Sequence, residues 1–228
     1  MTTIIKMKRA IVTITTGLIM KEMALSTHPF MRAYANKVGA DFIVWDTFRP
    51  HLTAHWKKLE LRGLLKQYDR VLLVDTDIVI RSCAPDIFDI VPEDKLGILD
   101  ETGIWGEKQV VERYFTVYNA LAKSLGFDRL KIKDFKDGRY LNTGVLVLSK
   151  GIDFFDPPAV EVQNFGEQTW LNAKILELDT PLFLLPAVFN YCISGGANPR
   201  DGFFVHYAGV LNRLVVLKKD CEEIYSNE

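Results

Sequence analysis

Apolar runs of strand length alternate along this chain with segments in which apolar residues recur every three or four positions. Such alternation is typical of parallel βαβ units that pack as a layered α/β protein. The pattern predicts strands at 10–15, 41–45, 71–74, 96–99, 144–149, 183–185 and 203–206. We therefore expect an α/β fold with a central sheet flanked by helices.

Helices are predicted between these strands, at 18–38, 56–67 and 165–178, with a further long amphipathic helix through Val111, Tyr114, Tyr118, Leu121 and Leu125. The first is expected to be broken near Pro29, where Thr27 can cap a new first turn. Gly39 is expected to end it, because glycine adopts the left-handed conformation that commonly closes a helix.

Composition and charge indicate the number of domains and exclude some classes of partner. The 228 residues carry 28 Lys+Arg against 29 Asp+Glu, and 48% are apolar. At this length about 70% of the unfolded surface is buried on folding, so one domain over 1–228 is expected. The balanced charge predicts no nucleic-acid partner. The basic residues near the start precede only a short apolar stretch, which predicts no signal peptide and no membrane span.

The cysteines indicate a compartment. Cys83, Cys192 and Cys221 are an odd number at wide separations, and they match neither a disulfide framework nor a CxxC metal or redox pair. A reducing, cytoplasmic location is therefore expected.

Candidate chemistry concentrates at Asp75 and Asp77, which follow the apolar run 71–74. Ligands bind at strand ends in open α/β sheets. Two carboxylates this close repel each other unless a cation lies between them, and oxygen ligands suit Mg²⁺ or Mn²⁺. The alternative is that both aspartates only form a turn, as aspartates often do.

The surrounding residues resemble a known family. The run from Lys58 to Asp77 resembles the segment that leads into the DxD motif of GT-A glycosyltransferases, especially the glycogenin-like family 8. Matching motifs follow in the family's order at 140–148, 166–172 and 205–209. The resemblance spans about 11–213 and implies a Rossmann-like, nucleotide-binding GT-A domain whose central sheet is mixed and mainly parallel.

The resemblance also implies roles for residues. Asp75, Asp77 and His206 would bind one Mn²⁺ or Mg²⁺, which holds the phosphates of a nucleotide-sugar donor, expected to be a UDP-sugar. Glu167 and Gln168 would lie beside the anomeric carbon of a sugar transferred with retention of configuration. The residues expected to bind the donor are Ile14, Thr16, Lys58, Thr76, Asn142, Gly209 and Arg213.

The chain departs from the family pattern at several positions. Glu167 stands where the family usually has aspartate. Asn212 stands where the family has a phosphate-binding lysine, which the adjacent Arg213 can replace as a bidentate ligand. Gly17 and Met20 replace a polar and an aromatic residue of the uridine-binding loop. The acceptor, whether glycan, protein or small molecule, is not specified; its subsites are expected at 48–55, 103–108 and 131–139.

Each assignment has a plain structural alternative. Lys58 can be a solvated lysine on an amphipathic helix, and His206 can be a hydrogen-bonded core histidine. Asn142 can be a turn residue, and Glu167 and Gln168 can belong to the acidic first turn of a helix.

Two other functions stay open. A haloacid-dehalogenase-like phosphatase would use Asp75 as its nucleophile, but that motif lies on the first strand of its family and needs acidic partners downstream. A non-catalytic sugar-nucleotide-binding domain is the second. No GxGxxG after the first strand, no GxxxxGK[ST] and no GxSxG occurs, which disfavours dehydrogenases, P-loop NTPases and hydrolases.

Overall fold

The computed structural model describes residues 7–46, 55–102, 139–152, 166–194 and 196–225. The long helix predicted through 111–125 and nearly all of the expected acceptor segments lie outside the described residues. No helix within the described ranges has both the length and the apolar character needed to cross a bilayer.

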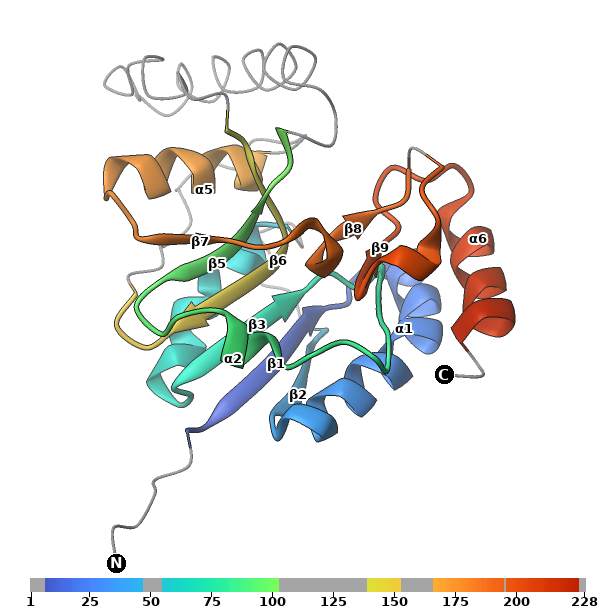
Figure 1. Ribbon diagram of the computed structural model, residues 1–228, viewed down its shortest axis with the longest axis horizontal. Helices are drawn as coiled ribbons and strands as arrows, with labels where there is room; N and C mark the ends of the chain where they lie inside the picture. Colours follow the sequence, from blue (N-terminus) through green and yellow to red (C-terminus); the bar gives the residue numbers. More distant parts are fainter. Residues whose placement is uncertain (1–6, 47–54, 103–138, 153–165, 195, 226–228) are drawn as a thin grey trace, which may run out of the picture.

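The strands of the described residues form two sheets (Figure 1). The larger has the order β2-β1-β3-β6-β5-β7, and the smaller has the order β4-β9-β8. The strand bounds are β1 Arg9–Ile14, β2 Asp41–Trp45, β3 Arg70–Val74, β4 Ile78–Ile80, β5 Leu96–Asp100, β6 Leu141–Ser149, β7 Leu182–Leu184, β8 Tyr191–Cys192 and β9 Phe204–His206.

The large sheet is mixed. Strand β1 is parallel to β2 and β3, and β5 is parallel to β7. Strand β6 runs antiparallel to both of its neighbours, β3 and β5. The expected α/β fold with a mixed, mainly parallel sheet is confirmed, whereas a chain of purely parallel βαβ units is wrong at β6.

Helices cover both faces of the large sheet, with α1 on one face and α5 on the other (Figure 1). The helical elements are α1 Gly17–Val38, α2 Ile87–Ile90, α5 Gly166–Glu177 and α6 Arg213–Asp220, the 3₁₀ helices η1 Trp56–Lys66, η3 Ala187–Phe189 and η4 Pro199–Asp201, and the π-helical turn η5 Cys221–Tyr225.

The alternation of side chains along a strand divides the core between these faces. In β3, Val71 and Leu73 pack under η1 and α5, whereas Leu72 and Val74 pack under α1. All four are fully buried, and each such side chain contributes about 1.5–3 kcal/mol to stability. Because β3 is packed on both faces, its carboxyl end has a fixed position, and Asp75 is the residue that follows it.

Helix α1 is continuous through Pro29, so the predicted break there is wrong. Proline leaves the carbonyl four residues earlier without its helical donor. That residue is Leu25, which is 72% exposed, so water can take the place of the donor. Thr27 does not cap a helix; its hydroxyl donates instead to the carbonyl oxygen of Thr76 at 2.8 Å. Gly39 ends the helix with a φ of 65°, as expected.

The segment predicted as a helix over 56–67 is a 3₁₀ helix, η1. Its tighter three-residue repeat directs Trp56, Leu59 and Leu65 toward the sheet. Lys58 is also buried. The expectation of an apolar stripe on the sheet is confirmed, but the type of helix is not.

The smaller sheet was not expected as a separate unit. Residues 78–80 follow the aspartates directly and read as a continuation of the same motif, yet they form β4 after the chain has turned. Val79 of β4, Val205 of β9 and Leu217 of α6 share a third core. This core joins β9 and α6 to β4, the strand that follows the two aspartates.

Candidate active site

Asp75, Thr76 and Asp77 form the turn between β3 and β4, and backbone hydrogen bonds hold both of its ends. The N–H of Asp75 donates to the carbonyl of Gly144 on β6 at 2.9 Å, and the carbonyl of Asp77 accepts from the N–H of Tyr207 at 3.1 Å. The hydroxyl of Thr76 donates to the carbonyl of Ile14 at 2.7 Å. Thr76 therefore anchors the turn to β1.

His206 reaches this turn because β9 pairs antiparallel with β4, placing His206 opposite Ile78. Its Nε2 lies 3.4 Å from Oδ1 of Asp77. One ligand atom from each of Asp75, Asp77 and His206 lies within 4.8 Å of the others. The three residues expected to bind a metal are thus brought together from two sheets.

The His206–Asp77 pair is buried and electrostatically coupled. Burial by itself would raise the pKa of Asp77, but His206 and Arg213 outweigh it and lower that pKa well below its usual range. Burial would lower the pKa of His206, but Asp77 outweighs it and raises that pKa. Without a competing cation, the pair is therefore an imidazolium bound to a carboxylate.

Two side-chain cations lie against the same carboxylates. Nζ of Lys58 is 2.8 Å from Asp75, and a guanidinium nitrogen of Arg213 is 2.6 Å from Asp77. Lys58 is buried, which would lower its pKa, but Asp75 and Glu167 outweigh burial and raise it. The sequence indicated that Asp75 and Asp77 repel each other. Lys58 and Arg213 offset this repulsion in the structure, and a bound metal ion could offset it further.

A second cluster lies beside the first, where α5 begins against β6. Oε1 of Glu167 accepts from the hydroxyl of Thr143 at 3.1 Å and lies 3.6 Å from Nζ of Lys58. Oε1 of Gln168 accepts from the N–H of Thr143 at 3.2 Å. Nε2 of Gln168 donates to Oε1 of Glu101 at 3.1 Å. Lys58 thus joins the expected catalytic pair to Asp75.

Asn142 extends this cluster toward His206. Its Nδ2 donates to Oε2 of Glu101 at 2.5 Å, and its Oδ1 accepts from Nδ2 of Asn190 at 2.7 Å. Oδ1 of Asn190 lies 2.7 Å from Nδ1 of His206. Asn142 is therefore a member of a buried network rather than an exposed turn residue.

Three further expected residues lie at or just after the ends of β1 and β9. Ile14 is buried at the end of β1 and bonds to Thr76. Thr16 precedes α1 without a capping bond from its side chain, and Gly209 has a φ of 71° between β9 and α6. No hydrogen bond or ion pair of the described residues joins Thr16 or Gly209 to the acidic turn.

Sequence reasoning did not identify Glu101, Thr143 or Asn190. Glu101 directly follows β5, the neighbour of β6, so it shows the same signal as Asp75: a carboxylate just after a buried strand. Thr143 lies within the motif at 140–148. Asn190 carries no local signal, since it lies between a single 3₁₀ turn and the two-residue strand β8.

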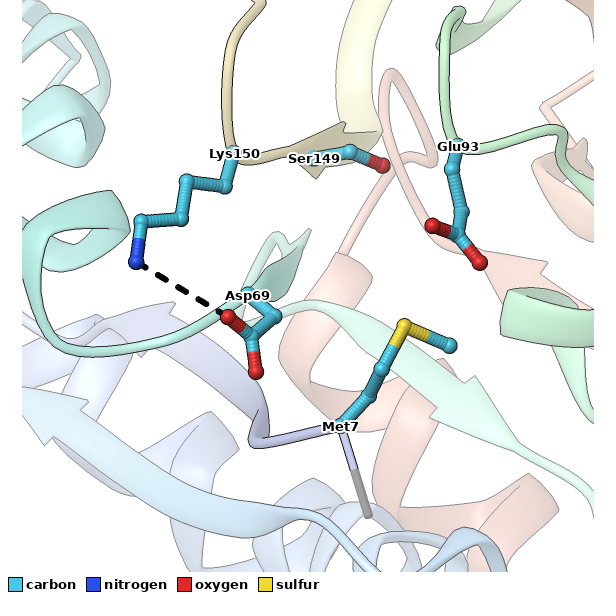
Figure 2. Close-up of a pocket in the computed structure, with 5 residues that line it drawn as sticks. All are labelled: Met7, Asp69, Glu93, Ser149 and Lys150. Carbon is cyan, nitrogen blue, oxygen red and sulfur yellow. Dashed lines mark ion pairs between the residues drawn. The ribbon is translucent and has the colours of Figure 1, made fainter. Parts of the chain in front are cut away.

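A hollow of about 310 Å³ lies elsewhere on the protein, lined by Met7, Asp69, Glu93, Ser149 and Lys150 (Figure 2). Asp69 precedes β3 and Ser149 ends the antiparallel β6. The hollow is therefore at the amino end of β3, opposite the acidic turn. Ligands of open α/β sheets bind at the carboxyl ends of strands, so the turn at Asp75–Asp77 is the candidate site rather than this hollow.

Comparison with known proteins gives a fold but no close relative. No protein-family model matches the chain, and no curated protein sequence matches it. Solved structures do match. A glycosyltransferase involved in the glycosylation of the major capsid of PBCV-1 aligns with a TM-score of 0.51 at 12% identity, over 92% of this chain and 99% of that one.

Two further structures agree. The bifunctional glycosyltransferase WbbM has a TM-score of 0.54 at 12% identity, and the apo form of the glycosyltransferase GlyE from Streptococcus pneumoniae TIGR4 has 0.50 at 14%. They cover 98% and 97% of this chain, which spans 51% of the WbbM chain and 62% of the GlyE chain. The chain has the GT-A glycosyltransferase fold. At these identities the likeness shows the GT-A fold alone, and membership of family 8 stays a prediction.

Proposed function

We propose that this chain is a metal-dependent glycosyltransferase of the glycogenin-like type, which moves a sugar from a UDP-sugar donor to an acceptor with retention of configuration. The observation that carries the proposal is the convergence of Asp75, Asp77 and His206 at the carboxyl end of β3 in a GT-A fold. That edge of an open α/β sheet is where ligands bind.

The donor atoms fit a divalent cation. Two carboxylates and one imidazole suit Mn²⁺ better than Mg²⁺, which prefers oxygen ligands alone. The side chain of Asp75 is 25% exposed, so the cluster can be reached from solvent. When bound, the metal supplies Lewis-acid stabilisation of the charge that develops on the departing nucleoside diphosphate.

Arg213 and Lys58 support a diphosphate site at the same place. Their cationic groups converge on Asp77 and Asp75, so positive charge is already directed to the region where the departing phosphate would lie. Fixed charges of this kind need no reorganisation as the leaving group becomes more negative. Arg213 can also bind phosphate with two parallel N–H donors, which an ammonium group does not provide. We therefore assign it the role of the lysine that Asn212 replaces.

The arrangement at α5 supports transfer with retention. An inverting enzyme needs a carboxylate base that faces the acceptor hydroxyl. Oε1 of Glu167 is directed instead to the hydroxyl of Thr143 and the ammonium group of Lys58. We assign Glu167, Gln168 and Asn142 to the donor sugar, and Ile14, Thr16, Thr76 and Gly209 to the nucleotide.

A cytoplasmic location belongs to the same proposal. All three cysteines are free, as expected in a reducing compartment.

Isothermal titration calorimetry with UDP tests the metal assignment. UDP is titrated with and without Mn²⁺ into wild type, Asp77→Asn and the matched control Asp94→Asn, which changes an exposed aspartate. We expect Mn²⁺ to strengthen UDP binding in wild type and Asp94→Asn but not in Asp77→Asn. An equal Mn²⁺ effect in all three would remove Asp77 from the metal site.

A turnover assay separates the proposal from its rivals. A panel of nucleotide sugars is incubated with the protein and Mn²⁺, and released UDP is measured beside inorganic phosphate from a phosphomonoester. Release of UDP that is lost in Asp77→Asn supports a transferase. Phosphate release that is lost in Asp75→Asn would indicate the phosphatase, and UDP binding without turnover would indicate a non-catalytic domain.

A further inference from the structure

Glu167, Gln168 and Asn142, assigned above to the donor sugar, are called the sugar cluster. Four buried side chains form a single line of hydrogen bonds from this cluster to His206. Glu101, Asn142, Asn190 and His206 are each no more than 9% exposed. Nδ2 of Asn142 donates to Glu101, and Nδ2 of Asn190 donates to Oδ1 of Asn142 at 2.7 Å. Oδ1 of Asn190 then faces Nδ1 of His206 at 2.7 Å. The line ends at a proposed metal ligand.

The direction of these bonds is fixed at Asn142, by the backbone of Gly144. Oδ1 of Asn142 accepts from the backbone N–H of Gly144 at 2.8 Å, and a backbone N–H can only donate. Asn142 must therefore turn its NH₂ group toward Glu101, whose two carboxylate oxygens accept from Asn142 and Gln168. The orientation of the Asn142 amide thus follows from its neighbours.

The same logic passes through Asn190. Since Oδ1 of Asn142 is an acceptor, Asn190 must present its NH₂ group there and its carbonyl oxygen to His206. A carbonyl oxygen accepts only, so Nδ1 of His206 must carry a proton. Sγ of Cys192 lies 3.8 Å from Nδ1 and is a weaker partner.

We propose that Asn190 is a positioning residue that holds the His206 proton on Nδ1 and so leaves Nε2, the nitrogen that faces Asp77, as the metal ligand. A bond from the second ring nitrogen commonly fixes the tautomer and orientation of a metal-binding histidine. The metal part of this inference rests on the proposed function, whereas the tautomer does not. Because Glu101 also accepts from Gln168, one buried carboxylate orients the expected metal ligand and the sugar cluster together.

Nuclear magnetic resonance of the wild-type, metal-free chain tests the Nδ1 proton directly. Protein is labelled with ¹⁵N-histidine, and the His206 signals are assigned by their loss in His206→Gln. We expect a proton on Nδ1 that exchanges slowly with water, because it is bonded to the buried carbonyl oxygen of Asn190. While Asp77 faces Nε2 and no metal is present, Nε2 also carries a proton. A ring without a proton on Nδ1, or an Nδ1 proton in fast exchange, would overturn the proposal, and this result needs no variant of Asn190 to fold.

A variant of Asn190 tests its effect on metal binding. Asn190→Leu removes the acceptor that faces Nδ1 of His206. Asn172→Leu is the matched control, because Asn172 is equally buried but bonds only to backbone groups of Leu141 and Gln168. Calorimetry with Mn²⁺ alone should show a loss of about 10- to 100-fold in Asn190→Leu. Asn172→Leu should stay near wild type even if it is less stable.

The possible failures are distinguishable. If wild type shows the Nδ1-protonated ring but no Mn²⁺ binding, the proposed function fails and the tautomer assignment stands. If wild type binds Mn²⁺ and Asn190→Leu binds it equally well, the positioning role of Asn190 is wrong and the proposed function stands. An equal loss in Asn190→Leu and Asn172→Leu also counts against Asn190, because the effect is then one of general stability.

Discussion

Gly144 lies directly against the imidazole of His206. A Cβ added to Gly144 would lie 2.5 Å from Cε1 of that ring and 2.9 Å from Oδ1 of Asn142. Real Cβ atoms do not approach other heavy atoms so closely, so the glycine in the motif at 140–148 serves close packing. Because Gly144 has no side chain, the His206 ring can lie against β6 at this position and face the acidic turn.

Gly144→Ala is therefore expected to displace His206 or Asn142. Overpacking of a dense interior commonly costs about 1–3 kcal/mol of stability, and Mn²⁺ affinity should fall with it. Gly63→Ala is the matched control, since a Cβ there meets nothing within 4 Å. Urea unfolding and Mn²⁺ calorimetry on both variants make the comparison. Wild-type metal affinity in Gly144→Ala would contradict a displacement of His206 from the metal site.

The Asp77–His206 pair predicts how stability depends on pH. The lowered pKa of Asp77 means that its contribution is present above about pH 4, the unfolded value, and is lost as pH falls toward the folded value. The raised pKa of His206 means that its contribution is complete below about pH 6.5 and is lost as pH rises through the folded value. The pair should stabilise the protein most between about pH 5 and 6.5.

Urea unfolding of wild type and Asp77→Asn across pH 3 to 10 measures this dependence. We expect the difference in free energy of unfolding to be largest in that window and to narrow on both sides. Asp94→Asn should track wild type throughout. A difference that stays constant with pH would show that the pair does not titrate as described.

Glu167→Gln tests retention. The substitution keeps the shape of the side chain and removes its ability to act as a base, so a retaining enzyme should lose activity without losing it entirely. The substitution also removes one of the two carboxylates that pair with the Lys58 ammonium group. The other, Asp75, remains 2.8 Å from it. Proton NMR of the product made by wild type gives the linkage. A β-linked product from an α-linked donor would contradict retention and make Glu167 the base.

The cysteines should react unequally with an aromatic disulfide reagent. Cys83 is exposed, whereas Cys192 and Cys221 are buried, and burial raises the pKa of Cys221 to about 12. Because the thiolate is the nucleophile, one thiol should react quickly at pH 8 and the others only on unfolding. Cys83→Ser should abolish the fast phase. Fast labelling of two or more thiols in the folded protein would contradict this burial.

Local patterns were sufficient for most elements and for the acidic turn. The apolar run over 71–74 predicted a strand, and the two carboxylates after it predicted a site at its end. These inferences hold because side-chain direction along a strand is set by the backbone itself. The same local reasoning missed that β6 runs antiparallel, because strand direction depends on which distant strand it meets.

The structure brings together expected site residues from motifs that are far apart in the sequence. The sequence pointed to these residues through the order of the motifs along the chain. The structure shows two groups of ion pairs: Lys58 lies 2.8 Å from Asp75 and 3.6 Å from Glu167, and His206 lies 3.4 Å from Asp77. What each does to its neighbours followed only from packing. Lys58 could have been a solvated lysine on sequence alone, but it is buried and bonded to the carbonyl of Thr143.

Local sequence was enough to predict the alternating strands and helices, the aspartates at a strand end and the glycine that ends α1, since each depends on neighbours a few residues away. Long-range packing, by contrast, makes Asn190, from a segment with no motif, bond to His206, and brings Gly144 against the same ring. The Gly144 contact crosses between the two sheets, and Asn190 reaches His206 from beside the neighbouring strand β8. In both places the partner of a buried group is set by long-range packing and by the need to satisfy every donor and acceptor removed from water.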